Sequence, residues 1–411
     1  MTKKILVLYR LSHPLPAARV AIRQHIQALS QLEDRCEVIY ANAVLGMPAW
    51  VRRVRFDGIV LHTTFLGMRW SPSFREWKEG LDWIGSLDCA KVALPQDEYD
   101  HSAVLDSWLA QWGVQTVFSC FGEEMWPILY PTLHGKARFV PCLTGYLLDG
   151  DAERIAAKCR PLSERPFDIV YRASKLPYWF GSHGQLKHEI AGIVREAAGR
   201  AGLRCDISTR PEDTIMGDRW FDFLASGRVV IGCESGSSVL DRDGGIMKAI
   251  EAMEAANPSL AFADVHKAMP EGWDDYRFFA ISPRHLEVVL TKTAQVLVEG
   301  SYSGVLEADR HFIPLRRDFS NLQEVMERVK DTAALAEMAE RAYEDILLGG
   351  KYTYRKFAEE ILTAVPDRPL DREYRRAGSG LFLEKALSLR GMAVDGIVSA
   401  RDRIMALKRI H

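Results

Sequence analysis

A glutamate stands at the end of one predicted strand, ahead of a run of small residues. Residues 228–232 are mostly apolar, and Glu234 follows them, ahead of Ser-Gly-Ser-Ser at 235–238. Ligands of α/β sheets bind at the carboxyl ends of the strands, and small residues let a ligand approach the backbone closely. Glu234 is therefore a candidate for contacting sugar hydroxyls or stabilising positive charge at an anomeric carbon. A carboxylate that balances the dipole of a helix N-terminus is the alternative.

A second strand end combines a helix start with two opposite charges. The apolar residues 278–281 lead into Ser282 and Pro283, which are typical of an N-cap and a first helical position. Arg284 and Glu287 then lie one turn apart on the same helix face. We expect Glu287 to hold the two hydroxyls of a ribose, with Ser282 and Arg284 beside the ligand. A local ion pair between Arg284 and Glu287 is the alternative.

Basic side chains and glycines follow a third predicted strand at 167–171. Arg172 comes directly after it, and Lys187 stands near the start of the next predicted helix, behind a loop with two glycines. Free N–H groups and the positive dipole end at a helix start suit a phosphate, and both cations could add charge. The motif is not GxGxxG, so a surface loop with solvated basic side chains is the alternative.

The predicted strand at 294–298 leads into another loop of small residues. Tyr302, Ser303 and Gly304 lie in it, and we expect them to pass close to a bound ligand. His311, a little further on, is interpreted as a core or edge histidine.

In the first half of the chain, titratable side chains also follow strands. His62 ends the predicted strand 58–62, and Asp97 and Glu98 follow the strand 91–95. Each is a candidate general base for an acceptor hydroxyl, with solvated rim loops as the alternative. There is no GxSxG elbow, which argues against a serine hydrolase. The neighbouring acidic residues are not spaced as metal ligands are, so no metal site is predicted.

The elements that position these residues alternate between short apolar strands and amphipathic helices. This pattern predicts parallel sheets with helices on both faces, so the fold class is α/β with two doubly wound domains. The expected domains are 1–155 and 166–345, joined by a polar connector and followed by C-terminal helices and a basic tail at 346–411. Strands are expected at 5–9, 36–41, 58–62, 91–95, 116–119, 138–141, 167–171, 204–208, 228–232, 278–281, 294–298 and 311–314.

Composition narrows the class of protein. The 411 residues carry a formal net charge of −2, which does not indicate a nucleic-acid partner. Seven cysteines without a CxxC indicate a reducing compartment. The apolar run at 5–9 is shorter than a signal peptide requires, and no run of about 20 apolar residues is seen. We therefore expect a cytoplasmic protein. The basic, amphipathic tail after residue 366 predicts peripheral contact with an anionic membrane or a partner, and a solvated terminal helix is the alternative.

The second half resembles a known family. The segments Ile-Ser-Pro-Arg at 281–284 with Glu287, His-Phe-Ile-Pro-Leu at 311–315 and Asp-Phe-Ser-Asn at 318–321 look like the C-terminal domain of family-1-like bacterial glycosyltransferases, with CgeB-like and surface-polysaccharide enzymes as the nearest forms. Residues 176–181 and 234–238 are similar to the same group. The resemblance covers about residues 167–362, and the first domain matches only in layout.

The resemblance implies the GT-B fold, in which two Rossmann-like domains face a cleft. It implies a metal-independent glycosyltransferase without a cofactor, whose nucleotide-sugar donor is bound mainly by the C-terminal domain. Glu287 matches the ribose-binding glutamate. Retaining members often carry a second glutamate eight positions earlier, where this chain has Phe279, so stereochemistry stays open. The acceptor would be a saccharide or lipid-linked saccharide in cell-surface polysaccharide synthesis.

Two other functions remain open. A sugar-nucleotide epimerase of the same fold would use the nucleotide site without an acceptor. A non-catalytic assembly protein would bind nucleotide sugars without turnover and dock through the basic tail. The sequence leaves open the donor base and sugar, the acceptor and the oligomeric state.

Overall fold

The chain forms two compact units, each built on a parallel sheet. The computed structural model describes residues 2–148, 150–215, 217 and 219–367, with 386–387, 390, 393–394 and 396–398 in the tail. The first unit comprises Met1–Cys142 and Tyr354–His411, and the second comprises Leu143–Thr353. The predicted α/β class with two doubly wound domains is confirmed.

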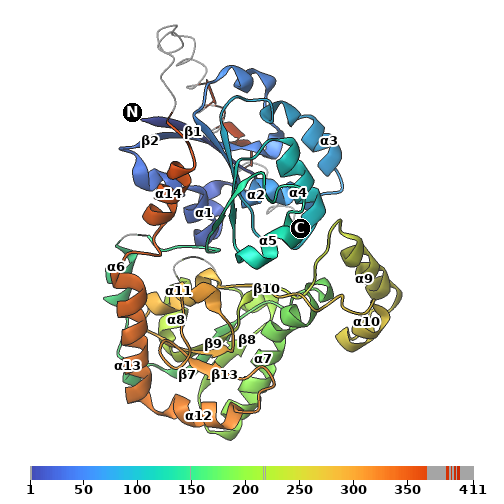
Figure 1. Ribbon diagram of the computed structural model, residues 1–411. Coiled ribbons are helices and arrows are strands. Elements are labelled where there is room, and N and C mark those ends of the chain that lie inside the picture. Colours follow the sequence, from blue (N-terminus) through green and yellow to red (C-terminus); the bar gives the residue numbers. More distant parts are fainter. Residues whose placement is uncertain are drawn as a thin grey trace. The chain divides into compact units, whose positions relative to one another are not determined.

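The first unit holds a six-stranded parallel sheet in the order β2-β1-β3-β4-β5-β6 (Figure 1). Its strands are short and buried, which is why they are rich in Val, Ile and Leu. They are β1 Lys3–Tyr9, β2 Cys36–Asn42, β3 Gly58–His62, β4 Ala90–Leu94, β5 Thr116–Ser119 and β6 Arg138–Pro141, and the helices are α1 Val20–Ile26, α2 Thr63–Leu66, α3 Phe74–Glu79, α4 Ser102–Gln111, α5 Trp126–Leu129 and α14 Tyr354–Thr363.

The second unit holds a five-stranded parallel sheet in the order β13-β12-β9-β7-β8. Its strands are β7 Phe167–Arg172, β8 Cys205–Ser208, β9 Gly227–Gly232, β12 Ala294–Val298 and β13 Ile313–Leu315, and its helices are α6 Asp151–Ala156, α7 Gly181–Arg200, α8 Arg219–Ser226, α9 Gly245–Ala256, α10 Phe262–Ala268, α11 Pro283–Leu290, α12 Leu322–Lys330 and α13 Thr332–Tyr343.

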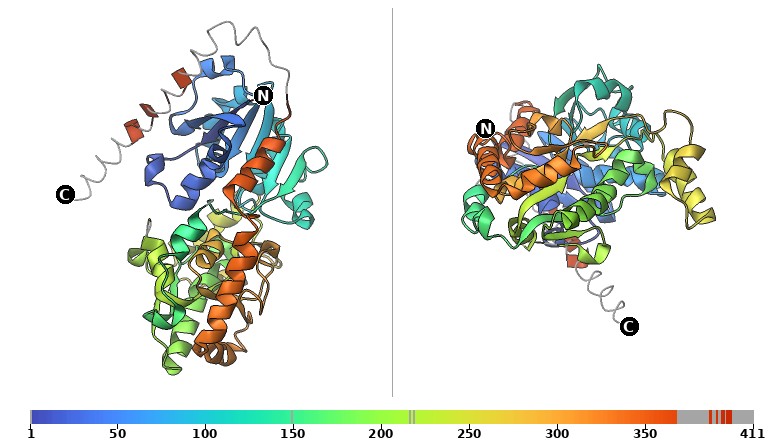
Figure 2. Two further views of the ribbon diagram at one scale, coloured as in Figure 1. Left: turned by 90° about the vertical axis from the view of Figure 1, so that its left-hand side faces the viewer. Right: turned by 90° about the horizontal axis from the view of Figure 1, so that it is seen from below.

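One predicted strand does not join the main sheet. Residues 278–281 were expected in the β/α series, but β11 (Phe278–Ala280) pairs antiparallel with β10 (Ser235–Ser237) in a separate two-stranded sheet. The segment between these strands carries α9 and α10, which lie beside the sheet-flanking helices rather than among them (Figures 1 and 2). They share a small apolar core around Ile250, Val265 and Trp273.

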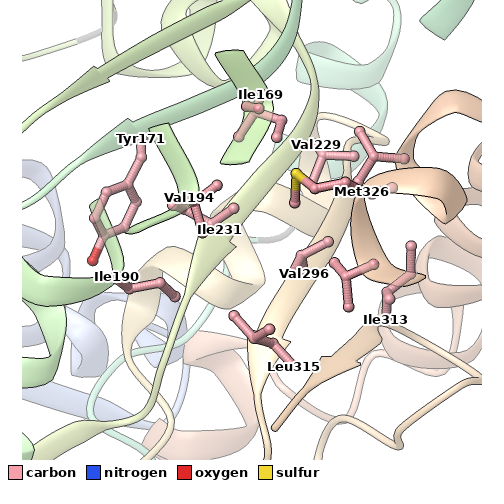
Figure 3. Packing of buried hydrophobic residues seen from close by; sticks show 14 of the residues in the cluster. Ile169, Tyr171, Ile190, Val194, Val229, Ile231, Val296, Ile313, Leu315 and Met326 are labelled. Atoms are coloured by element: carbon pink, nitrogen blue, oxygen red, sulfur yellow. The ribbon is translucent and has the colours of Figure 1, made fainter. Parts of the chain in front are cut away.

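The largest apolar cluster of the second unit lies between its sheet and helices that include α7 and α12. Ile169, Val229 and Val296 come from three neighbouring strands, and Val194 of α7 and Met326 of α12 pack against them (Figure 3). All five side chains are nearly inaccessible to solvent. This packing fixes the carboxyl ends of β7, β9 and β12 relative to the start of α7.

The unit boundaries differ from the expected domains at 1–155, 166–345 and 346–411. The second unit begins at Leu143, because Leu143 and Ile155 pack in the same apolar cluster as Leu286 of α11. Helix α14 belongs to the first unit, where it packs on the segment Ala28–Leu32.

The expected polar connector is also anchored. Arg165 is 2% exposed, and its guanidinium donates to the carbonyl oxygens of Gly227 and Thr291, both at 2.9 Å. Such bonds to desolvated carbonyls fix the segment that leads into β7.

In both sheets the strand order reverses at the first strand, while all strands stay parallel. In the second unit β8 lies on one side of β7 and β9 on the other. In the first unit β2 and β3 flank β1 in the same way. Carboxyl ends at such switch points form the usual ligand crevices of open α/β sheets.

Candidate functional site

Three cations gather where β7 and β9 end. Lys187, in the second turn of α7, donates from Nζ to Ser235 Oγ at 3.2 Å. Arg284, at the start of α11, lies over the rings of Tyr171 and Trp220, each 5.4 Å from its guanidinium carbon. Arg317, after β13, lies 5.7 Å from the ring centre of Phe279. Burial raises the pKa of the Cys233 thiol, and all three cations oppose that rise, so they share one neighbourhood.

A buried histidine connects Arg317 to the end of β9. His183 Nε2 lies 3.1 Å from the carbonyl oxygen of Glu234, which makes Nε2 the donor. Nδ1 is then the acceptor for Arg317 Nη1 at 3.4 Å, and the ring stacks on Phe279 at 3.7 Å. Burial, then Arg317 and Lys187, lower the pKa of His183 to about 3. The ring is therefore neutral and adds no positive charge of its own.

The two arginines of this cluster form no direct ion pair among the described residues, although Arg284 interacts electrostatically with Glu287 and Arg317 with Glu234. Within the same part of the chain, Arg284 Nε is buried without a hydrogen-bond partner. Burial, then Arg284 and Lys187, also lower the pKa of His285 to about 3. An anion with several charged oxygens is the ligand that such a group of side chains attracts.

Glu234 lies in this cluster, but its carboxylate binds the chain itself. The side chain is 4% exposed and accepts from Tyr302 N at 2.6 Å and Ser301 Oγ at 3.1 Å. Burial raises its pKa, and these donors act against the rise. Glu234 thus holds the loop after β12. The alternative was a carboxylate that balances the dipole of a helix N-terminus, and Tyr302 begins the short 3₁₀ helix Tyr302–Gly304.

The loop that Glu234 holds is strained. Tyr302, Ser303 and Gly304 have φ values of 46°, 54° and 69°, so three consecutive residues are left-handed. Such backbone costs about 1–3 kcal/mol per non-glycine residue and clusters at functional sites. Ser303 Oγ accepts from Ile281 N at 3.2 Å, which ties the loop to the residue before the N-cap of α11.

Helix α11 begins as predicted. Ser282 is the N-cap, Pro283 the first helical residue, and Ser282 N donates to His285 Nδ1 at 3.1 Å. The alternative ion pair between Arg284 and Glu287 does not form. Instead Trp220 Nε1 donates to Glu287 Oε2 at 2.8 Å, and burial raises the pKa of this carboxyl group. Trp220 therefore contacts both predicted ligand-binding residues of α11.

Arg172 does not join the cluster. Its Nη2 forms an ion pair with Asp206 Oδ1 at 2.7 Å, and its Nε donates to the carbonyl of Asp213 at 3.2 Å. The guanidinium also lies over Phe223, 4.4 Å from the ring centre. With these partners Arg172 braces β7 against β8 rather than offering its charge to a ligand.

The predicted phosphate position at the start of α7 is contradicted, because a side chain of the protein already occupies it. Asp274, 4% exposed, accepts from Ser182 N at 2.9 and 3.1 Å, and His183 N donates to Ser238 Oγ at 3.1 Å. Gly181 has a φ of 69°, and a Cβ there would collide with Asp274. Asp274 supplies the negative charge at this helix start, so a phosphate must lie elsewhere.

Sequence reasoning missed Arg317, His183 and Trp220. Arg317 follows β13 by two residues, so the strand-end rule applied to the last strand would have found it. Phe279 stands eight positions before Glu287, where retaining enzymes often have a second glutamate. Two glutamates eight positions apart do occur further along the chain, at Glu299 and Glu307. Both are exposed and flank the strained loop.

The candidates in the first unit separate into one exposed and two buried residues. His62 is 1% exposed, with Nε2 2.9 Å from His25 Nδ1 and Nδ1 accepting from Thr64 N at 3.1 Å. Burial holds the pKa of His62 well below its usual value. Both ring nitrogens are engaged inside the unit, which contradicts a role as base for an external hydroxyl.

Glu98 is fully buried and accepts from Cys120 N at 2.7 Å and Tyr130 Oη at 2.6 Å. Burial raises its pKa to about 7. Asp97 is exposed, and its Oδ1 accepts from Tyr99 Oη at 2.7 Å. Of these predicted bases, only Asp97 reaches solvent at the rim of the sheet.

Within the described ranges no three His, Cys, Asp or Glu side chains come together as a set that could hold a metal ion. A search of the same ranges finds no helix with the length and apolar character needed to cross a membrane.

Comparison with known proteins gives matches only among solved structures. No family model and no curated protein matches the chain. HepE from Anabaena, in complex with UDP-glucose, aligns with a TM-score of 0.46 and 11% identity over 88% of this chain and 100% of its own. An alpha-glucosyltransferase in complex with UDP-glucose and DNA containing an abasic site aligns with a TM-score of 0.45 and 11% identity, over 89% of this chain and 100% of its own. Sucrose-phosphate synthase from Thermosynechococcus elongatus aligns with a TM-score of 0.44 and 12% identity, over 88% of this chain and 98% of its own.

Proposed function

We propose that the second unit binds the diphosphate of a nucleotide sugar, and that the protein transfers the sugar to a saccharide or lipid-linked saccharide acceptor. The observation that carries this proposal is the cluster of Lys187, Arg284 and Arg317 at the carboxyl ends of β7 and β9. Those ends form the switch point of the sheet, where open α/β units bind nucleotides.

The roles proposed for the cations, for Glu287 and for the loop Tyr302–Gly304 follow from their charges and their hydrogen bonds. Negative charge grows on the diphosphate as it leaves the sugar, and fixed cations in a partly desolvated site stabilise that charge. Glu287 is our candidate for the ribose hydroxyls, since Trp220 fixes one carboxylate oxygen and leaves the group oriented. The strained loop Tyr302–Gly304, held by Glu234, would lie along the sugar or phosphate.

On the acceptor side we propose Asp97 as the general base, because its carboxylate is exposed at the carboxyl end of β4. That the two units face one another across a cleft stays a prediction. So do transfer without a metal, a role in cell-surface polysaccharide synthesis, the absence of a nucleic-acid partner and the location in the cytoplasm. The basic tail proposed for membrane contact lies mostly outside the described residues.

The test is nucleotide binding to charge variants of the cluster. UDP, GDP and their common sugar esters should raise the melting temperature of the wild type, because a ligand that binds only the folded state stabilises it. Hydrogen bonds to charged groups contribute about 1.5–3 kcal/mol, so Lys187→Ala and Arg317→Ala should each weaken binding roughly tenfold to a hundredfold. Arg316→Ala removes the neighbouring arginine, which is exposed as Arg317 is but contacts Ser320 instead of His183, and it should leave binding unchanged.

A nucleotide panel without any stabilising member would refute the proposal, as would equal binding by wild type and both cluster variants. Product analysis then separates the reaction types. An epimerase converts the donor sugar without an acceptor, and a non-catalytic protein binds the donor without turnover.

A further inference from the structure

Trp70 is an exposed aromatic residue on the rim of the first unit. It is 37% exposed, and the other nine tryptophans are all less accessible. It ends the short 3₁₀ helix Gly67–Trp70, which follows α2 at the carboxyl end of β3. Because β3 and β4 are neighbours in the sheet, Trp70 belongs to the same rim as Asp97.

One buried guanidinium holds Trp70 and Asp97 in place together. Arg69 is 2% exposed, and its guanidinium carbon lies 4.2 Å from the ring centre of Trp70. From Nη2 it donates to the carbonyls of Gln96 at 3.0 Å and Asp97 at 2.8 Å, and from Nε to that of Asp100 at 2.9 Å. The indole ring and the loop that carries Asp97 therefore both contact the Arg69 guanidinium.

The loop that carries Asp97 contains two residues with left-handed backbone. Asp97 and His101 have φ values of 49° and 53°, which non-glycine residues rarely adopt. The Asp97 carboxylate is oriented by Tyr99, whose hydroxyl donates to it at 2.7 Å and whose side chain is 3% exposed. Strained backbone that its surroundings enforce in this way is typical of binding and catalytic sites.

The surroundings of Trp70 favour a small polar ligand over a membrane or a protein partner. The residues that follow it and are exposed include Ser73, Arg75 and Glu76. No broad apolar patch of the kind that marks protein interfaces surrounds the ring within the described residues.

We propose that Trp70 and Asp97 form the acceptor subsite and bind a pyranose ring. The inference rests on the proposed function and deepens it. A pyranose presents C–H groups on one face and hydroxyls at its edge. An indole ring makes apolar contact with the C–H face, and an oriented carboxylate accepts hydrogen bonds from the hydroxyls.

The test uses the full chain and a panel of methyl glycosides, namely those of glucose, galactose, mannose and N-acetylglucosamine. Saturation-transfer NMR should show transfer from the protein to ring C–H protons for at least one of them. Trp70→Ala should reduce that transfer at least fivefold, while Trp70→Phe keeps most of it because it retains an aromatic face. Leu348→Ala, which shortens the 71% exposed Leu348 in the second unit, should change nothing.

Nucleotide binding, measured in the same samples by thermal shift, separates this inference from the proposed function. Trp70→Ala should bind nucleotides like the wild type, since the cation cluster is untouched. If nucleotides bind and no glycoside shows transfer, the acceptor subsite is refuted and the donor site stands. Equal transfer in the wild type and Trp70→Ala, or a changed oligomeric state in Trp70→Ala, would also overturn it.

Discussion

Two buried glutamates, one in each unit, hold loops at the carboxyl ends of strands. Glu98 binds Cys120 N after β5, and Glu234 binds Tyr302 N after β12. Burial raises the pKa of both carboxyl groups, so each is costly to ionise. Their backbone partners reduce that cost and at the same time fix the loops. At the level of single residues, these acids are better understood as positioning groups than as proton-transfer groups.

The raised pKa of Glu98 predicts a pH-dependent stability. Its pKa rises from 4.5 to about 7 on folding, so the folded state binds a proton that the unfolded state has lost. The contribution is fully present below about pH 4.5 and is lost as the pH rises through about 7, a change of about 3 kcal/mol at most. Glu98→Gln cannot titrate, so the wild type should lose stability relative to this variant as the pH rises.

Urea unfolding at about pH 5 and about pH 8 measures this difference. Burial lowers the pKa of His25 to about 4. His25 titrates equally in the wild type and in Glu98→Gln, so its contribution cancels in the stability difference between them. Glu123→Gln, at an exposed position, is the matched control and should follow the wild type. A constant stability difference across the two pH values would contradict the raised pKa.

At the scale of elements, helix α7 depends on a segment distant in sequence. Asp274, which follows α10, accepts from Ser182 N and Ser238 Oγ and so caps the helix that carries His183 and Lys187. Asp274→Ala removes this cap, which should cost about 1–2 kcal/mol. Nucleotide affinity should fall as well, because His183 and Lys187 move with the helix start.

Asp275→Ala changes the adjacent exposed acid and serves as the control for this experiment. Urea denaturation gives the stability of each variant, and thermal shift with the nucleotide panel gives binding. If Asp274→Ala and Asp275→Ala unfold at the same urea concentration, the cap contributes nothing.

How much the sequence could reveal depends on where each partner lies. The strand-end rule located Lys187, Glu234, Ser282, Arg284 and Tyr302, which the fold brings together, because apolar strands and the residues after them are local features. It misassigned Arg172 and His62, since their partners, Asp206 and His25, are 34 and 37 positions away in sequence. It failed at the start of α7 because Asp274, which accepts from Ser182 N there, is 92 positions away in sequence.

At the scale of the whole molecule, the two units differ in how the chain builds them. The second is one continuous segment, Leu143–Thr353, whereas the first needs α14 from beyond it. Tyr354, Phe357 and Ile361 of that helix are buried in the first unit. We therefore predict that residues 143–353 alone fold cooperatively and retain nucleotide binding.

Circular dichroism and thermal shift of this fragment test that prediction. The matched fragment 1–142 lacks α14 and should fail to give a cooperative transition, because His25 and its apolar neighbours lose their cover. A cooperative melt of 1–142 alone would contradict the role given to α14.

The return of the chain to the first unit also sets an order of events during synthesis. The ribosome releases the whole of Leu143–Thr353 before it releases Tyr354–Thr363. Domains fold as their residues emerge. The second unit is therefore complete before α14, the helix that covers the sheet of the first unit, has been synthesised. During that interval the surface around His25 and Leu29 is open to chaperones, and a premature stop before residue 354 leaves it open permanently.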